Sequence, residues 1–118
     1  MRAKTKPLRP SLREKKRYIV FEFVSEHKFN AHDVSYAITD ACRKYIGEFG
    51  LAKAKIKFIS NAYMPEKNRG IIRVANKAVE PVVASLVMIT NIKGRRAAYH
   101  TIGKSGILKK AKNKFLTK

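Results

Sequence analysis

Residues 17–24 read RYIVFEFV, a run of β-branched and aromatic side chains bounded by charged and polar segments. Such residues favour a β-strand. Because side chains alternate along a strand, Ile19, Phe21 and Phe23 are expected on one face, and Tyr18 and Val20 on the other. Both faces are thus substantially apolar. The run therefore predicts a central strand that is covered on both sides of its sheet.

The segment before this strand, residues 1–16, is basic and poor in apolar residues, and Pro7 and Pro10 disfavour a helix. We expect a flexible basic arm over 1–16 and a single domain over 17–118. Two interpretations of the arm stay open. It is either a solvating extension or an arm that becomes ordered on nucleic acid.

After the strand, residues 30–50 carry the clearest helical pattern of the chain. Asn30 is a candidate N-cap with Asp33 three residues on, which resembles a capping box. Gly50 is expected to end the helix. Apolar side chains recur at spacings of three and four, the pattern of one buried helical face, at Val34, Ala37, Ile38, Ala41, Cys42, Tyr45, Ile46 and Phe49.

The next segment, residues 51–64, alternates between lysine and apolar residues, with Lys53, Lys55 and Lys57 on one side. A period of two predicts a strand with one buried face and one basic face. The turn sequence PEKNRG at 65–70 leads into a shorter apolar run at 71–75. Together these predict a β-hairpin.

The C-terminal third predicts a helix over 76–91, a strand over 95–102 and a final helix. Pro81 is compatible with the first of these helices only within its first turn. Gly103 is expected to form a turn and Ser105 to cap the final helix. The apolar face of that helix comprises Ile107, Leu108, Ala111, Phe115 and Leu116. The residues between these apolar positions include many lysines and no acidic residue. The lysines are either a solvated face or a face turned toward a polyanion.

The order β-α-β-β-α-β with right-handed crossovers predicts an α+β fold of the ferredoxin-like, or RNA-recognition-motif-like, class. Both helices would cover one face of a four-stranded antiparallel sheet, and an extra C-terminal helix would follow. The other face of the sheet would then need cover or a ligand.

Charge is the strongest compositional signal. The 118 residues include 27 Lys and Arg against 8 Asp and Glu, a formal net charge of +19. Residues 18–50 hold five acidic and three basic residues, whereas residues 81–118 hold nine basic residues and no acid. This uneven distribution predicts a nucleic-acid-binding surface. The single Cys42 rules out an internal disulfide and is expected to be buried, in keeping with a cytoplasmic protein; no apolar run is long enough for a membrane span.

Residues with catalytic chemistry are scattered. The eight carboxylates show no paired spacing, and His27, His32 and His100 belong to no metal-binding motif. Base stacking on the sheet is also disfavoured, because Ile71, Arg73 and Ala75 stand where aromatic residues would be needed. We therefore expect no protein active site and no cofactor or metal bound by the protein, with RNA contacted through its phosphates.

Three stretches resemble the archaeal ribonuclease P protein component 2 family, whose eukaryotic relatives share the Pop-five/Rpp-fourteen domain. They read LREKKRYIVFE at 12–22, GIIRV at 70–74 and GKSGILKKA at 103–111. The last is similar to the family signature G-x-S-G-T-I-K-x-A, with Ile107 where threonine is common. The resemblance covers about residues 12–117 and includes the order of elements.

This resemblance implies a noncatalytic, RNA-binding subunit of ribonuclease P, the endonuclease that removes 5′ leaders from precursor tRNA. It also implies catalysis by the RNA subunit with Mg ions at the RNA active site, so that pre-tRNA is met indirectly. A larger barrel-fold protein is the implied partner, and self-association would give a two-plus-two heterotetramer. A ribosomal or other structural RNA-binding protein is the alternative. A small acylphosphatase-like enzyme on the same fold would require turnover by the protein alone.

The expected RNA-binding residues are basic side chains in the arm, on the second strand, before the last strand and around the final helix. They are Arg9, Arg13, Lys15, Lys16, Arg17, Lys53, Lys55, Lys57, Arg95, Arg96, Lys104, Lys109, Lys110 and Lys114.

Overall fold

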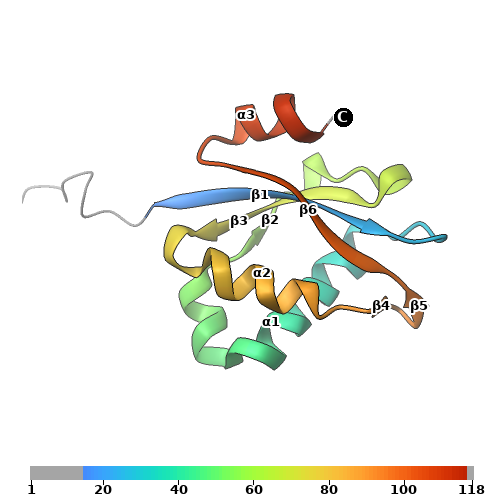
Figure 1. Ribbon diagram of the computed structural model, residues 1–118, viewed down its shortest axis with the longest axis horizontal. Helices are drawn as coiled ribbons and strands as arrows, with labels where there is room; N and C mark the ends of the chain where they lie inside the picture. The colour runs from blue at the N-terminus through green and yellow to red at the C-terminus, as the bar shows by residue number, and fades with distance from the viewer. Residues whose placement is uncertain (1–14, 117–118) are drawn as a thin grey trace, which may run out of the picture.

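The fold is an α/β sandwich with a third, thinner layer. The computed structural model describes residues 15–116 (Figure 1). Its strands are β1 Lys16–Val24, β2 Lys57–Phe58, β3 Arg69–Ala75, β4 Asn91–Ile92, β5 Arg95–Arg96 and β6 Ala98–Ser105. Its helices are α1 Ala31–Ala54, α2 Val79–Val87 and α3 Leu108–Ala111, which continues as a π-helical turn, Lys112–Leu116. Short 3₁₀ turns occupy Ser60–Ala62, Pro65–Lys67 and Asn76–Ala78.

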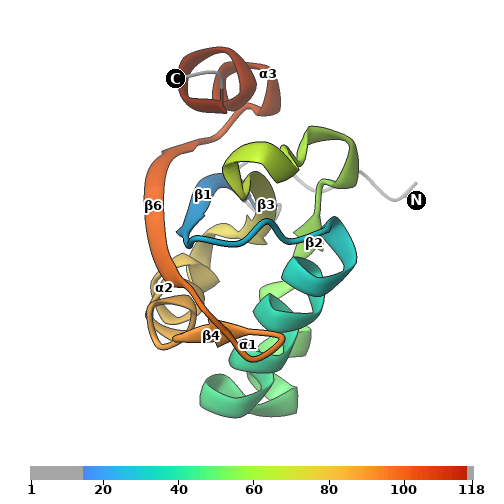
Figure 2. The same ribbon diagram turned by 90° about the vertical axis from the view of Figure 1, so that its right-hand side faces the viewer.

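The main sheet has four antiparallel strands in the order β2-β3-β1-β6, so β1 is central as predicted. Helices α1 and α2 lie on one face of this sheet and α3 lies on the other (Figures 1 and 2). The predicted α+β ferredoxin-like class with an extra C-terminal helix is therefore confirmed. β4 and β5 form a separate two-stranded hairpin that lies apart from the start of β1.

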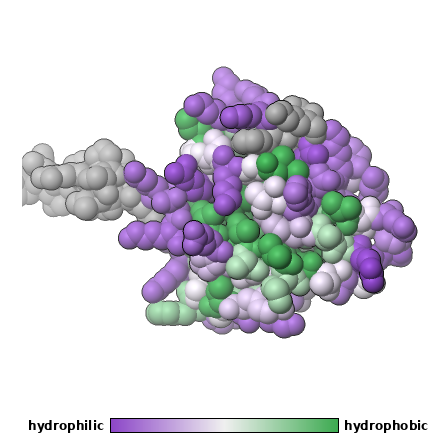
Figure 3. Space-filling view, in the orientation of Figure 1, coloured by the Kyte–Doolittle hydropathy of each residue, from purple (hydrophilic) through white to green (hydrophobic). Residues whose placement is uncertain are grey.

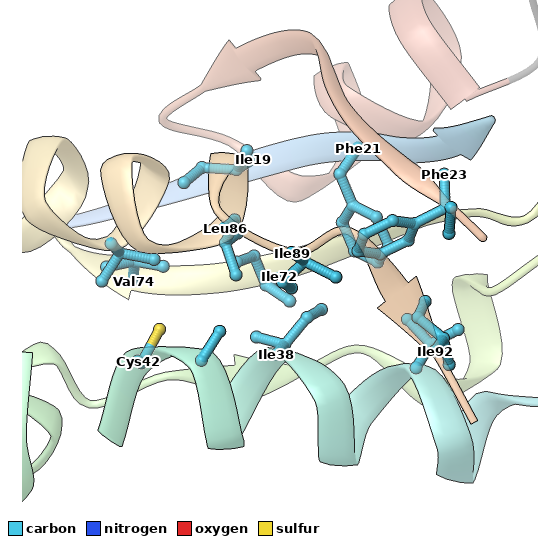
Figure 4. Close-up of a cluster of buried hydrophobic side chains, with 14 of the residues drawn as sticks. Ile19, Phe21, Phe23, Ile38, Cys42, Ile72, Val74, Leu86, Ile89 and Ile92 are labelled. Carbon is cyan, nitrogen blue, oxygen red and sulfur yellow. The ribbon is translucent and has the colours of Figure 1, made fainter. Parts of the chain in front are cut away.

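The principal core lies between the sheet and the two helices. From β1, Ile19, Phe21 and Phe23 point into it and are at most 1% exposed (Figure 4). They meet Ile38 of α1 and Leu86 of α2. The alternation read from residues 17–24 therefore sets the face on which the helices pack.

The opposite face of β1 has its own, smaller core. Val20 and Ile71 are fully buried there against Ala111 of α3, with Tyr18 and Ile102 packed around them. The cover that this face needs is thus supplied by α3 and by the connection between β2 and β3. A sheet covered in this way leaves no platform for base stacking.

The first helix differs from the prediction beyond its start. Asn30 caps it as expected, and its side chain accepts a hydrogen bond from the Asp33 backbone N–H at 2.8 Å. The helix breaks at Gly47 and not at Gly50. Gly47 has a φ of 74°, in the left-handed region that glycine adopts more easily than other residues. Helix then resumes to Ala54, so the strand expected over 51–64 shrinks to Lys57–Phe58. Leucine, alanine and lysine are strong helix formers, and here they outweigh the alternating pattern.

This kink also overturns part of the predicted buried face. Val34, Ile38 and Cys42 are buried, but Tyr45 and Phe49 are 45% and 77% exposed. Phe49 leaves the buried face because the helix beyond Gly47 follows a new axis. Tyr45 precedes the kink, and its exposure is a separate departure from the prediction.

The second helix and the last strand have new boundaries. α2 is shorter than the predicted 76–91, but Pro81 lies in its first turn as required. The strand expected over 95–102 is divided: Arg95 and Arg96 belong to the β4–β5 hairpin, and β6 runs to Ser105.

The predicted turn at Gly103 and the predicted cap at Ser105 are both wrong. β6 continues through both residues because a bulge opposite Val20 and Phe21 lets it stay paired with β1 as far as Tyr18. Ser105 instead accepts a hydrogen bond from the Ile107 backbone N–H at 3.1 Å, and Ile107 is the N-cap.

The apolar face of the final helix is confirmed only in part. Ala111 is fully buried and Leu108 packs beside it, but Ile107 is 53% exposed. The side chains of Phe115 and Leu116 lie outside the described residues.

Candidate nucleic-acid interface

The sheet register brings basic residues from distant parts of the chain to one end of the domain, where β1 begins. Lys104 of β6 lies opposite Ile19 of β1, two residues from Arg17. On the other side of β1, Lys16 pairs with Ala75, the last residue of β3, and the chain continues to Lys77. Antiparallel pairing therefore gathers the start of β1, the end of β6 and the start of α2.

The Arg17 side chain helps to fix this junction. Its Nε donates a hydrogen bond of 3.0 Å to Oδ1 of Asn76, in the turn that leads into α2. One groove is lined by Arg17, Lys77 and Lys104, and Glu80 also lines it. Three cations are thus held on three separate elements around a shared hollow.

The far end of α1 extends the same basic surface. After Gly47 the helix turns back toward the sheet (Figures 1 and 2). Lys53 and Lys55 therefore share a second groove with Lys77, which borders both grooves. We call the surface formed by Lys15, Lys16, Arg17, Lys53, Lys55, Lys77 and Lys104 the basic end. Hydrophilic side chains gather at this end in the space-filling view (Figure 3).

Most acidic residues that pair with a lysine or arginine lie away from the basic end. Glu22 accepts hydrogen bonds from Arg69 at 2.6 and 3.0 Å, and Glu48 pairs with Arg43 at 2.7 Å. Asp33 lies 3.9 Å from Lys93. Among the described residues that line the two grooves, Glu80 is the only acid. The basic end therefore keeps a strong positive charge.

The predicted residues divide among several places. Lys15, Lys16, Arg17, Lys53, Lys55 and Lys104 meet at the basic end, and Lys57 lies next to Arg73 on β2. Arg95 and Arg96 lie on the small hairpin, apart from the basic end (Figure 1). Arg9 and Arg13 lie outside the described residues.

The remaining three predicted residues lie on the other face of the sheet, and all three are exposed. Lys109 and Lys110 belong to α3, and Lys114 belongs to the π-helical turn that continues it. Hydrophilic side chains also follow this upper layer (Figure 3). Because Ala111 anchors the helix, its lysines project from a docked element.

Lys77 was missed by sequence reasoning. It is a single lysine before an otherwise apolar helix, and only the pairing of β1 with β3 places it beside Arg17. The available signal was the position of Lys77 directly after a strand that neighbours β1.

The described residues offer little for catalysis. No three His, Cys, Asp or Glu side chains within residues 15–116 lie together as a metal site. His27 lies 3.3 Å from an Arg95 nitrogen, and His32 and His100 are exposed. In the same part of the chain, no helix is long and apolar enough to cross a membrane.

Cys42 is buried in the core as predicted, and its burial raises the pKa of the thiol from 9.0 to about 11. Burial and the nearby Asp33 charge raise the pKa of Tyr63 from 10.0 to about 12. Both groups bind their protons more tightly in the folded protein than in the unfolded chain.

We therefore expect the free energy of unfolding to fall above pH 9. The contribution of Cys42 is fully present below pH 9 and is lost as the pH rises to 11, and that of Tyr63 is lost between pH 10 and 12. Urea titrations at pH 8 to 11 would measure this loss. The Cys42→Ala variant, although less stable overall, should lose less stability between pH 9 and 11. An equal pH dependence in both proteins would contradict the assignment to Cys42.

Known proteins share both the sequence and the fold. The sequence profile of the Rpp14/Pop5 family matches residues 17–116. Ribonuclease P protein component 2 of Pyrococcus furiosus is 41% identical over 120 residues, covering 99% of this chain and 96% of that protein. The protein of the same name from Thermococcus gammatolerans is 42% identical over 116 residues, covering 98% and 95%. A chain in the cryo-EM structure of yeast ribonuclease MRP has the same fold, with a TM-score of 0.63, 11% identity and 85% of each chain covered.

Proposed function

The chain belongs to the Rpp14/Pop5 family, and from this membership we propose that it is a noncatalytic protein subunit of ribonuclease P, which removes 5′ leaders from precursor tRNA. The observation that carries the proposal is the basic end, where cations from β1, the end of α1, the turn before α2 and β6 meet around two adjoining grooves. A ribosomal role is not favoured, because the similar curated proteins are ribonuclease P components.

The proposed mechanism is electrostatic. A folded RNA brings phosphates close together, and lysine and arginine side chains reduce the repulsion between them by displacing condensed counterions. The basic end and the lysines of α3 act on the RNA subunit in this way. The RNA holds the Mg ions and performs the cleavage, and the protein meets pre-tRNA only through the assembled particle.

We further propose that a larger barrel-fold protein subunit binds this chain, and that two copies of each form a heterotetramer. The exposed Tyr45, Val87 and Met88 side chains support a protein-binding surface on the helical face of the domain. Hydrophobic surface is visible over α2 (Figure 3). Asp33 and Asp40 line a hollow on this face together with Tyr45 and Met88, so the face is less suited to RNA than the basic end.

Reconstitution tests the proposed function. Adding this chain together with its barrel-fold partner to the catalytic RNA should lower the Mg²⁺ concentration at which pre-tRNA is cleaved. The partner alone with the RNA is the control. The reason is that protein cations replace part of the Mg²⁺ needed to fold the RNA. An unchanged Mg²⁺ requirement would refute the proposal, as would cleavage by the protein without RNA.

A further inference from the structure

The second groove of the basic end has a composition that phosphate binding alone does not explain. It has a volume of about 490 Å³ and lies between the last turns of α1 and the start of α2. Its apolar surface is formed by Ile46, Gly50, Ala75, Ala78 and Pro81, and the other three lining residues are Lys53, Lys55 and Lys77. Among these lining residues there is no acid.

Small residues leave room in this groove. Ala75 and Ala78 present only methyl groups, and Gly50 presents no side chain. A Cβ at Gly50 would stand 3.0 Å from Cβ of Ile46, so the glycine also allows the close packing of this turn. The kink at Gly47 directs this part of α1 back toward the sheet (Figure 2). The hollow therefore follows from specific small residues and a specific bend.

We propose that this groove binds one unstacked base of an RNA strand, with the adjoining phosphates held by Lys53, Lys55 and Lys77. The inference rests on the proposed RNA-binding function and identifies the chemical form of RNA that the basic end takes. A nucleobase has an apolar face that suits a floor of alanine, isoleucine and proline. The volume of the groove lies in the range of about 300–1,000 Å³ typical of small-molecule sites.

The surroundings favour a strand over a single anion. Lys77 and Pro81 also border the neighbouring groove of Arg17 and Lys104, so the positive surface continues beyond the base site. A nucleic-acid strand carries a phosphate at every step and can follow such a surface. Glu80 lines only this neighbouring groove, where its carboxylate would repel a phosphate.

An exposed aromatic ring lies beside one of these lysines. Nζ of Lys53 is 4.8 Å from the centroid of the Phe49 ring, which is 77% exposed. Aromatic rings next to cations are the usual stacking partners of single-stranded nucleic acid. Phe49 therefore offers a stacking surface for a second base close to the first.

Lys55 supplies a further indication. It ends α1 with a φ of 51°, the left-handed region that glycine adopts more easily than lysine. Lysine at this position places a cation at the groove at a conformational cost. We expect Lys55→Gly to bind RNA more weakly, which salt titrations would measure. Unchanged RNA affinity would contradict this role.

The test compares two short RNA backbones in fluorescence anisotropy: one fully abasic, and one abasic except for a single central base. The native chain should bind the one-base strand about tenfold more tightly, because stacking contributes about 1–3 kcal/mol per base. Ala78→Leu should fill the groove and bring the two affinities together, without weakening binding to the abasic strand. Ala84→Leu, at an exposed position of α2, is the matched control and should keep the tenfold ratio.

A second measurement needs no substitution. Addition of the one-base strand should shift the methyl NMR signals of Ile46 and Ala78 and leave that of Ile107 unchanged. Equal affinity for both strands, or the absence of a methyl shift, would overturn the inference. It would also be overturned if an acidic peptide bound the groove more tightly than the strand and displaced it. Such a failure would leave the proposed function untouched if reconstitution with the native chain succeeds.

Discussion

Replacing Lys53, Lys77 and Lys104 together with glutamine is expected to weaken binding to ribonuclease P RNA about a hundredfold at 0.1 M salt. The three residues stand on α1, before α2 and on β6, and Lys77 lies between the two grooves that the others line. Glutamine keeps the length and polarity of the side chains but removes their charge. Arg17 is left unchanged because its guanidinium binds Asn76 and supports the fold.

The physical reason is counterion release. Each lysine that neutralises a phosphate contributes somewhat less than one unit to the slope of log K against log salt, so the triple variant should lose about two to three units. Filter binding at several salt concentrations would measure both the affinity and the slope. Because phosphate contacts carry no sequence information, the loss should be similar for different RNA sequences.

A matched variant separates local from overall charge. Lys28, Lys67 and Lys93 are exposed and lie outside the basic end, so replacing them with glutamine removes the same total charge. We expect this control to change affinity by only a few fold. An equal loss in both variants would show that net charge alone drives binding and that the basic end is not a site.

The overall fold was predictable because several local signals agree with the long-range pairing. The alternation of Ile19, Phe21 and Phe23 marks the face that packs on the helices, and Asn30 marks the start of α1. Pro81 marks the first turn of α2. Each signal is stereochemical and acts within a few residues, so it can be read without knowledge of the tertiary structure.

The candidate site was less predictable because its residues meet only through the sheet. The strand assigned to residues 51–64 placed Lys53, Lys55 and Lys57 on one face, whereas the first two lie at the end of α1. The register that brings Lys104 and Lys77 to the start of β1 includes a bulge, which no local pattern announced. A bulge shifts every later residue of a strand, so one such feature moves the whole end of β6.

The largest effect on stability is expected at Asn68, which ties two loops to β1 from the end of the domain opposite the basic end. Asn68 is 2% exposed and has a φ of 51°. Its Nδ2 donates a hydrogen bond of 2.7 Å to the His27 carbonyl, and its Oδ1 accepts one of 2.9 Å from the Phe29 N–H. The Tyr63 hydroxyl donates to the Phe29 carbonyl at 2.7 Å, so the same loop is held twice.

Asn68→Ala should lower the free energy of unfolding by about 4 kcal/mol. It leaves the buried Phe29 N–H and the partly buried His27 carbonyl without partners, at about 1–3 kcal/mol each, and it places alanine in a left-handed conformation, at about 1 kcal/mol. Asn68→Gly removes the same hydrogen bonds but accepts the backbone conformation, so its loss should be smaller by about that last amount. Urea unfolding at pH 7 would compare both variants with Asn61→Ala, an exposed control expected to change stability by less than about 0.5 kcal/mol.

Because His27 and Phe29 lie far from Lys77 and Lys104, Asn68→Gly should still bind RNA normally under conditions where it is folded. A loss below about 1 kcal/mol for Asn68→Ala would show that water replaces the lost contacts, and that these loops do not depend on the asparagine.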